Sequence, residues 1–426
     1  VFGKKQEWKY GAYVDTDEDN QINDVHPAWT KKPSELKDED YIAFYHQLYP
    51  QTFEEPLFWI HLNVDYPFNL TGILYFPKVK NQMELQRNKI QLYANQVFVT
   101  EDVEGIVPEY LTLLHGVIDS PDIPLNVSRS YLQSDAQVKK ISNHISKKVA
   151  DRLDELFRNE RSLFEDKWES LKVFVQYGML SDEKFYDRAV KFDLVTDIDG
   201  KHFTLDEYRT LTEGEQTDKE GQLVWLYTND RNSQYTAIER AKAKGYSVLL
   251  LDGPLDVHAV SQLEQKLEKT RFVRVDSDSI DKLIAKDEQR AVSLSDVEQK
   301  ALKALFEGRL PREEKRNYSV SLEALGADAD AVLITQGEFM RRMQEMARLQ
   351  PGMNFYGELP EGYNVVLNTE HPLILRLLAS EKEVVEPKLS TLRAELQEQS
   401  ELVEAARTVQ SAKKPEEVSV AEREEL

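Results

Sequence analysis

Strand-like and helix-like segments alternate along the chain from about residue 190 to residue 275. The strand-like segments are LVWLYTND (223–230), YSVLLLDGP (246–254) and RFVRV (271–275), and helix-like segments at 233–245 and 255–269 separate them. Strands this apolar need cover on both faces, and connecting helices of this length supply it. This region therefore predicts a small parallel or mixed sheet with helical cover.

A second strand-rich region precedes it. A helix is predicted at DEDYIAFYHQL (38–48) and strands at FWIHLNV, LTGILYFP and IQLYANQVFVT, whereas VPEYLTLLHGVID (107–119) favours a helix. A long helix then follows, because apolar residues recur at steps of three or four. That stripe consists of Val138, Ile141, Ile145, Val149, Leu153 and Leu156.

The two ends of the chain differ in composition and apolar pattern from these regions. Residues 1–21 are polar and acidic and predict a linker. A third unit is expected to begin with the amphipathic segment LSDVEQKALKALFEG (294–308) and to continue with strands and a methionine-rich helix from Gly337. The tail from Glu381 carries a heptad-like stripe at Leu389, Leu392, Leu396 and Val403. This stripe predicts either a helix that packs on a partner or a mostly solvated helix. Both ends of the chain look cut, so we expect a fragment of a longer polypeptide.

Composition excludes several classes of function. The net charge of −22 argues against a general nucleic-acid binder, which needs a basic surface. The absence of cysteine excludes disulfides and thiolate metal sites and suggests a reducing, cytoplasmic compartment. No apolar run is long enough for a membrane span. The eight histidines have no metal-ligand spacing, and no phosphate-binding loop or nucleophile elbow is present. A self-sufficient hydrolase is therefore not expected, and no metal site is predicted.

One arginine has an unusual position. Arg129 follows Ser128, a plausible N-cap, at the start of the long helix, where a cation opposes the helix dipole. A guanidinium beside free helix N–H groups suits a phosphate. The alternative is an exposed loop arginine, or one paired with Asp119 or Asp122.

Methionine is concentrated near the C-terminal end of the third unit. Phe339, Met343 and Met346 share one face of the predicted helix through steps of four and three. Flexible methionine suits a surface that accepts varied partners. Burial in an ordinary core is the alternative.

Longer runs of sequence point to a known family. Four runs resemble the ninety-kilodalton heat-shock chaperones, called HtpG in bacteria. These runs are INDVHPAWTKKPSEL (22–36), GILYFPK (72–78), the run from Leu92 to Gln133 that contains PLNVSR, and YNVVLNTEHPLI (363–374). The resemblance covers residues 22–375 or so in the right order. It implies a multidomain α/β and α+β protein of the heat shock protein 90 family, without the N-terminal ATPase domain.

The resemblance also implies a domain layout. Residues 1–21 would be the linker, 22–188 a three-layer α/β middle-domain unit with a helical coil, and 189–290 a smaller α/β unit. Residues 291–380 would be a mixed α+β C-terminal domain whose dimerisation part is incomplete. Residues 381–426 would be a charged helical tail or insertion without a clear family match.

Roles for individual residues follow from the resemblance as well. Arg129 would reach the γ-phosphate of ATP held, with Mg²⁺, by the missing N-terminal domain; Gln133 and Asn126 would assist it. Phe339, Met343 and Met346 would contact unfolded client proteins, as would Phe53, for which a core position is the alternative. The parent protein would be a homodimer. A stand-alone protein-binding scaffold without nucleotide-linked activity remains the competing hypothesis.

The chain departs from the family at two places. Asn95 and Gln96 stand where relatives commonly carry arginine, which weakens any anion contact expected there. His258 stands where some bacterial relatives have a client-contacting tryptophan, so no role is assigned to it.

Overall fold

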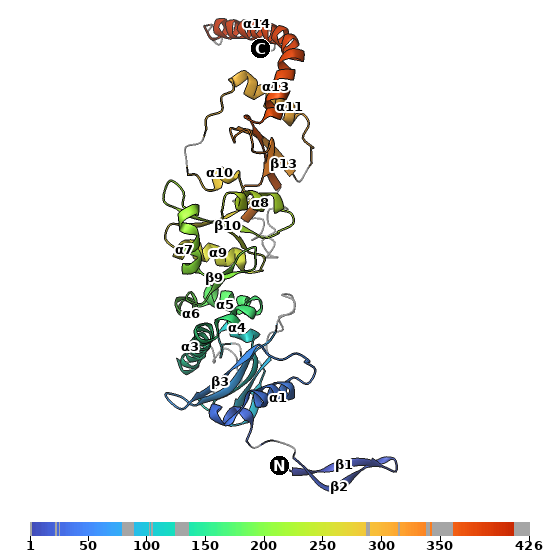
Figure 1. Ribbon diagram of the computed structural model, residues 1–426. Coiled ribbons are helices and arrows are strands. Elements are labelled where there is room, and N and C mark those ends of the chain that lie inside the picture. The colour runs from blue at the N-terminus through green and yellow to red at the C-terminus, as the bar shows by residue number, and fades with distance from the viewer. Residues whose placement is uncertain are drawn as a thin grey trace. The chain divides into compact units, whose positions relative to one another are not determined.

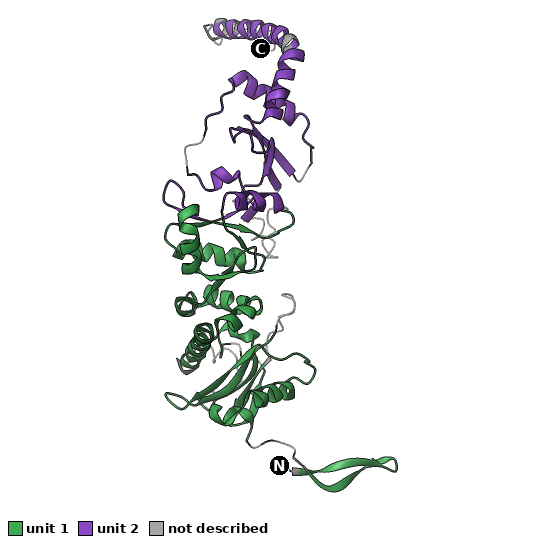
Figure 2. Cartoon of the chain, viewed as in Figure 1, with its two compact units in different colours: residues 1–215, 225–233, 246–272 green, residues 216–224, 234–245, 273–426 purple. Residues whose placement is uncertain are grey.

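The computed structural model describes most of the chain (Figure 1). The described residues are 2–21, 24, 26–78, 89–101, 103, 105–123, 136–286, 290–313, 316–337, 341–342 and 361–412. They form two compact units (Figure 2). The first comprises residues 1–215, 225–233 and 246–272, and the second comprises residues 216–224, 234–245 and 273–426.

A β-hairpin occupies the segment that was predicted as a linker. Strands β1 (Phe2–Lys9) and β2 (Ala12–Gln21) pair antiparallel, with Lys9 opposite Ala12. Tyr10 and Gly11 both have positive φ, as a tight two-residue hairpin turn requires. The hairpin was not anticipated because acidic side chains dominate β2 and hide its alternation.

A five-stranded mixed sheet forms the core of the first unit. Its order is β3-β4-β7-β5-β6, antiparallel except for the parallel pair β5 and β7. The strands are β3 (Phe58–Val64), β4 (Leu70–Phe76), β5 (Lys89–Ala94), β6 (Val97–Thr100) and β7 (His115–Asp119). The predicted strand at 90–100 is therefore two strands, which are joined by a turn at Asn95 and Gln96, both with positive φ.

Helices cover both faces of this sheet. On one face lie the 3₁₀ helices η1 (Ala28–Thr30) and η2 (Pro33–Glu35) and helix α1 (Asp38–Leu48). Ile73 and Tyr75 of β4 pack there in an aromatic cluster. Phe76 points to the opposite face and contacts Phe174 of α5, with ring centroids 5.4 Å apart. The expected three-layer α/β architecture is confirmed.

The coil of helices follows β7 in the chain. It consists of α3 (Ala136–Asn159), α4 (Arg161–Asp166), α5 (Trp168–Ser181) and α6 (Glu183–Ala189). The predicted stripe on α3 is buried throughout, from Val138 to Leu156. The helix expected at 107–119 is wrong. This segment forms a short 3₁₀ helix, η3 (Glu109–Leu113), and then β7.

The predicted alternation of strands and helices is confirmed beyond residue 190. A small sheet has the order β11-β10-β12, in which β10 and β11 are parallel, and β8 pairs antiparallel with β9. The strands are β8 (Leu194–Thr196), β9 (His202–Thr204), β10 (Leu223–Thr228), β11 (Val248–Leu250) and β12 (Thr270–Arg274). The helices are α7 (Leu205–Gln216), α8 (Tyr235–Ala243), α9 (Asp256–Lys266) and α10 (Ile280–Leu283).

The C-terminal part of the second unit is a mixed α+β arrangement. Strands β13 (Arg316–Glu323) and β14 (Val332–Thr335) flank β15 (Glu361–Asn368), parallel and antiparallel respectively. Its helices within the described residues are α11 (Asp296–Glu307), α13 (Pro372–Val384) and α14 (Glu386–Ala412). Leu302, Val365 and Ile374 belong to its core. No helix within the described ranges is long and apolar enough to cross a membrane.

Candidate functional site

Most of the predicted site residues lie outside the described residues. Asn126, Arg129 and Gln133 fall in 124–135, and Phe339, Met343 and Met346 fall in 338–340 and 343–350. Phe53 is described, so it is the one predicted site residue whose surroundings can be examined. The chain on both sides of 124–135 is also described.

The buried carboxylate of Asp119 ties together three segments just before residue 124. It ends strand β7 and is 6% exposed. Its Oδ2 accepts hydrogen bonds from Trp29 Nε1 at 3.2 Å and from the main-chain N of Gln96 at 2.9 Å. Its Oδ1 is buried without a hydrogen-bond partner among the described residues, and the two bonds to Oδ2 give Asp119 a structural role of its own.

A second group of hydrogen bonds fixes the next residues to Asn69, just before β4, and to Tyr93 in β5. Ser120 Oγ donates to the carbonyl of Asn69 at 2.6 Å, and Asp122 Oδ2 accepts from the Asn69 main-chain N at 2.6 Å. The main-chain N of Ser120 donates to Tyr93 O at 3.1 Å. The two carboxylates proposed as alternative partners for Arg129 therefore already hold other groups in place.

Helix α3 fixes the chain on the C-terminal side of the same segment. Ile141 and Ile145 are completely buried. Ser146 on this helix shares a hydrogen bond of 2.8 Å with Tyr110 Oη and donates to Asp182 Oδ2 at 3.1 Å. The described chain is thus anchored on both sides of residues 124–135.

Phe53 lies in the connection between α1 and β3 and is 95% exposed. This exposure rules out the core position that the sequence left open. A phenyl ring held almost entirely in water gains nothing for the fold, so an exposed aromatic at a loop is a candidate contact for another molecule. Its contact with client proteins stays a prediction.

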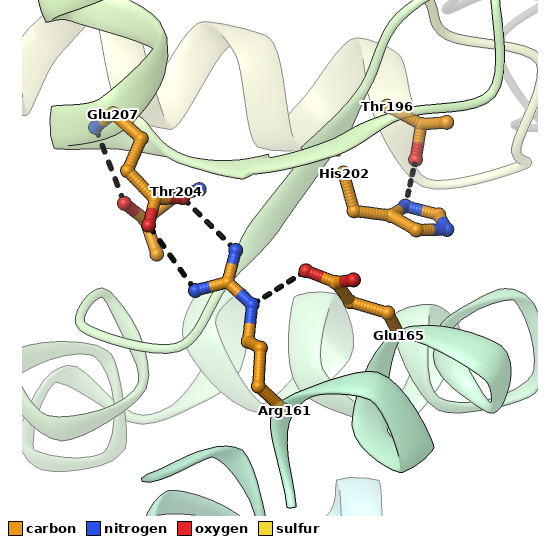
Figure 3. Close-up of polar contacts among 6 residues, drawn as sticks. All are labelled: Arg161, Glu165, Thr196, His202, Thr204 and Glu207. Carbon is orange, nitrogen blue, oxygen red and sulfur yellow. Dashed lines mark hydrogen bonds and ion pairs between the residues drawn. The ribbon is translucent and has the colours of Figure 1, made fainter.

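A polar cluster in the first unit was not predicted from the sequence (Figure 3). Arg161, in α4, donates to both carboxylate oxygens of Glu207 in α7, at 3.2 and 2.9 Å, and to Glu165 Oε1 at 2.5 Å. Its guanidinium also lies 4.6 Å from the ring centroid of Phe157. The cluster therefore joins the helical coil to the start of the smaller α/β region.

Glu207 has a second role in the same cluster. It accepts from the main-chain N of Thr204 at 2.8 Å, and Thr204 Oγ1 accepts from the main-chain N of Glu207 at 3.2 Å. This reciprocal pair is a capping box at the start of α7. The hydrogen bond from Arg161 holds the pKa of Glu207 below its usual range although partial burial opposes it. The Thr-x-x-Glu spacing is the sequence pattern of such a cap, whereas no local pattern connects Glu207 with its partner Arg161.

Within the described parts of the chain, no group of three His, Cys, Asp or Glu residues is placed to hold a metal ion. The rings of His61 and His115 are instead bonded through Nδ1 to tyrosine hydroxyls of α1, Tyr41 at 2.8 Å and Tyr45 at 3.0 Å. These histidines belong to the aromatic layer under the sheet.

Comparison with known proteins identifies the class. The model of the family described as Hsp90 protein matches residues 4–412, nearly the whole chain, and the chain belongs to this family. The resemblance inferred from the sequence is confirmed. The matched range includes residues 381–412, and the assignment of 381–426 as a charged helical tail or insertion stays a prediction.

Particular relatives carry a more specific name. The chain is similar to proteins named chaperone protein HtpG. It is 68% identical over 424 residues to that of Porphyromonas gingivalis and 58% identical over 426 residues to that of Bacteroides fragilis. Each match covers 100% of this chain and 62% of the relative, so the chain spans less than two thirds of these relatives. The solved middle domain of a putative heat shock protein of Plasmodium falciparum matches with a TM-score of 0.47 and 20% identity, and covers 59% of this chain and 100% of that one.

Proposed function

We propose that the chain is the middle and C-terminal portion of an ATP-dependent molecular chaperone. The observation that carries this proposal is the Hsp90 family match over residues 4–412 together with 68% identity to a chaperone protein HtpG. In this proposal ATP and Mg²⁺ bind to an N-terminal domain outside the chain. The protein is a cytoplasmic homodimer that takes non-native proteins as clients and binds neither nucleic acid nor membrane.

The proposed chemical role of the chain is to supply a cation to the transferred phosphate. When bound, Mg²⁺ neutralises part of the phosphate charge, and transfer still requires further positive charge at the γ-phosphate. Arg129 supplies it, and Gln133 and Asn126 position it. Support comes from the anchored chain on both sides of residues 124–135, at Asp122 and at α3, because a guanidinium helps only if it reaches one defined place.

The test is steady-state ATP turnover by the full-length parent carrying Arg129→Ala, with ATP affinity measured alongside. Loss of a cation that acts in the transition state is expected to lower kcat by at least about tenfold and to leave ATP affinity nearly unchanged. Arg152→Ala is the matched control, since Arg152 is a partly exposed arginine on α3 that pairs with Glu155. Equal turnover in the Arg129 variant would favour the competing hypothesis, a protein-binding scaffold without nucleotide-linked activity.

A further inference from the structure

A buried ionic cluster in the first unit is unrelated to the predicted site. Asp256, the first residue of α9, is 2% exposed and accepts three hydrogen bonds. Lys172 Nζ of α5 donates to Oδ2 at 2.8 Å, Gln176 Nε2 donates to Oδ1 at 2.7 Å, and the main-chain N of Gly253 donates to Oδ2 at 2.7 Å. The carboxylate also lies at the positive end of the α9 dipole. Asp256 is thus fully satisfied as an anion, with Lys172 as its counterion.

A second carboxyl group shares this cluster without an equivalent set of partners. Asp193, between α6 and β8, is 5% exposed, and its Oδ1 is buried with no hydrogen-bond partner among the described residues. The groups that act on it come from each neighbouring element: Lys172 from α5, Asp256 from α9, Tyr186 from α6 and the main-chain N of Leu194 in β8. Two buried carboxyl groups therefore act on one ammonium, that of Lys172, whose side chain is 13% exposed.

The balance of buried charge decides whether both carboxyl groups are ionised or one of them carries a proton. With both carboxyl groups ionised, a net negative charge would be buried, which is costly unless a proton neutralises it. Burial is the main cause that raises the pKa of Asp193 to about 7; Asp256 adds to it, and Lys172 opposes it. Asp256 accepts three hydrogen bonds whereas Asp193 Oδ1 has no partner among the described residues, so of the two carboxyl groups Asp193 is the one that favours a proton.

The turn at Gly253 is packed directly on the ion pair. A Cβ at this position would lie 3.0 Å from Asp256 Oδ2 and 3.3 Å from Lys172 Nζ. The turn before α9 and helix α5 consequently depend on the same two charged groups, and any movement of the ammonium alters both.

We propose that Asp193, Lys172 and Asp256 form a proton-linked latch within the first unit. With a proton on Asp193, Lys172 bonds Asp256 and holds α5 to the turn before α9. When that proton leaves, the Asp193 carboxylate attracts the same ammonium, and the contact between α5 and α9 loosens. A change of pH across neutrality would then alter how firmly the helical coil is held to the smaller α/β region.

Stability should depend on pH with a definite sign. Below the ordinary pKa of an aspartate both the folded and the unfolded chain carry the proton. As the pH rises from about 4 to about 7 the unfolded chain loses it first, so the contribution of Asp193 to stability falls, and above about 7 it stays constant. Asn at this position is always neutral and removes the dependence.

The experiment compares wild type with Asp193→Asn in the 426-residue chain. Urea unfolding midpoints are measured from pH 5 to pH 9, and amide exchange is measured at Gly253 and the first turn of α9. The excess of the variant midpoint over wild type is expected to grow from pH 5 to about 7 and then level off. At pH 8.5 exchange at Gly253 should be at least about tenfold slower in the variant, since the pKa of Asp193 is raised to about 7, by more than one unit, and each unit corresponds to a factor of ten. Comparison at equal pH cancels intrinsic exchange.

Two further variants keep the result decisive. Asp193→Ser is neutral and smaller, and it must reproduce the same pH dependence even if its overall stability is lower. Asp187→Asn is the matched control, because Asp187 is an exposed aspartate on α6. A midpoint difference that stays constant with pH, or one that Asp187→Asn also produces, would overturn the latch.

Discussion

Single residues in the five-stranded sheet leave little freedom for substitution, and Gly116 is the sharpest case. It has a φ of 134°, and its main-chain N donates to Tyr49 Oη at 2.7 Å. A Cβ there would lie 2.0 Å from the carbonyl oxygen of Ile73 in the neighbouring strand. We expect Gly116→Ala to lower the free energy of unfolding by at least about 2 kcal/mol, because both the dihedral angle and the contact are incompatible with a side chain.

The matched control for this prediction is Gly214→Ala. Gly214 lies in α7, where nothing is within 4 Å of the position of an added Cβ. There alanine should stabilise the chain by about 0.5–1 kcal/mol, since it favours the helix over the unfolded chain. Urea unfolding of both variants measures the contrast. Similar effects of the two substitutions would mean that the close approach of β4 and β7 is not rigid.

At the level of single residues, the sequence predicts burial only where a local pattern such as helical periodicity exists. The stripe on α3 was predictable because helical periodicity is local, and burial followed it residue by residue. Lys172, Asp193 and Asp256 could not be predicted to meet, since they come from distant parts of the chain and each is an ordinary residue in its own segment. The exposure of Phe53 was equally open, because nothing in a loop sequence determines whether the fold covers it.

Among the elements, α7 depends on a cap that another helix supports. Glu207 caps α7 with Thr204 and accepts two hydrogen bonds from Arg161. We expect Glu207→Gln to lower the free energy of unfolding at pH 7 by about 0.5–1 kcal/mol, a small value because the pair is partly solvated. The pKa of Glu207 is lowered in the folded chain, so this contribution is present at neutral pH and is lost as the pH falls below about 4.

Urea unfolding at pH 7 and pH 3.5 measures this dependence, with Glu239→Gln as control. Glu239 is an exposed glutamate on α8. The difference between wild type and the Glu207 variant should shrink at pH 3.5 and in high salt, whereas that of the Glu239 variant stays near zero throughout. A Glu207 effect that is unchanged at low pH would show that the ion pair with Arg161 contributes nothing.

The type of an element was predictable where apolar periodicity and a capping pattern agree. The prediction was wrong where apolar periodicity was the only indication. Ser295 caps α11 together with Glu298, and that helix was predicted. The run 107–119 has apolar residues at helical spacing, yet Gly116 and the pairing with β4 and β5 draw its second half into the sheet. Tertiary pairing outweighs local preference in a strand that is buried on both faces.

For the whole molecule, the alternation of strands and helices predicted the α/β class, and the family match supports the same architecture. The domain boundaries at residues 22, 189, 291 and 381 stay predictions. The sites proposed for ATP-linked activity and for client contact rest mainly on the resemblance to the family, because the physical patterns of the residues left other roles open. Only Phe53 among them lies within the described residues.

Client binding is proposed for the whole molecule, and Phe53 offers a test of that proposal. An aromatic side chain that is 95% exposed offers apolar area to an unfolded polypeptide at no cost in folding energy. We expect Phe53→Ser to weaken binding to reduced, carboxymethylated α-lactalbumin, a permanently unfolded probe, by about threefold to tenfold, since burial of one aromatic ring contributes on the order of 1 kcal/mol.

Tyr235→Ser is the control, because Tyr235 is an exposed aromatic on α8 with 61% exposure. Fluorescence anisotropy of the labelled probe measures both affinities at equal unfolding midpoints. If the two variants weaken binding equally, the contact is general stickiness of exposed rings, and Phe53 has no special part in holding clients.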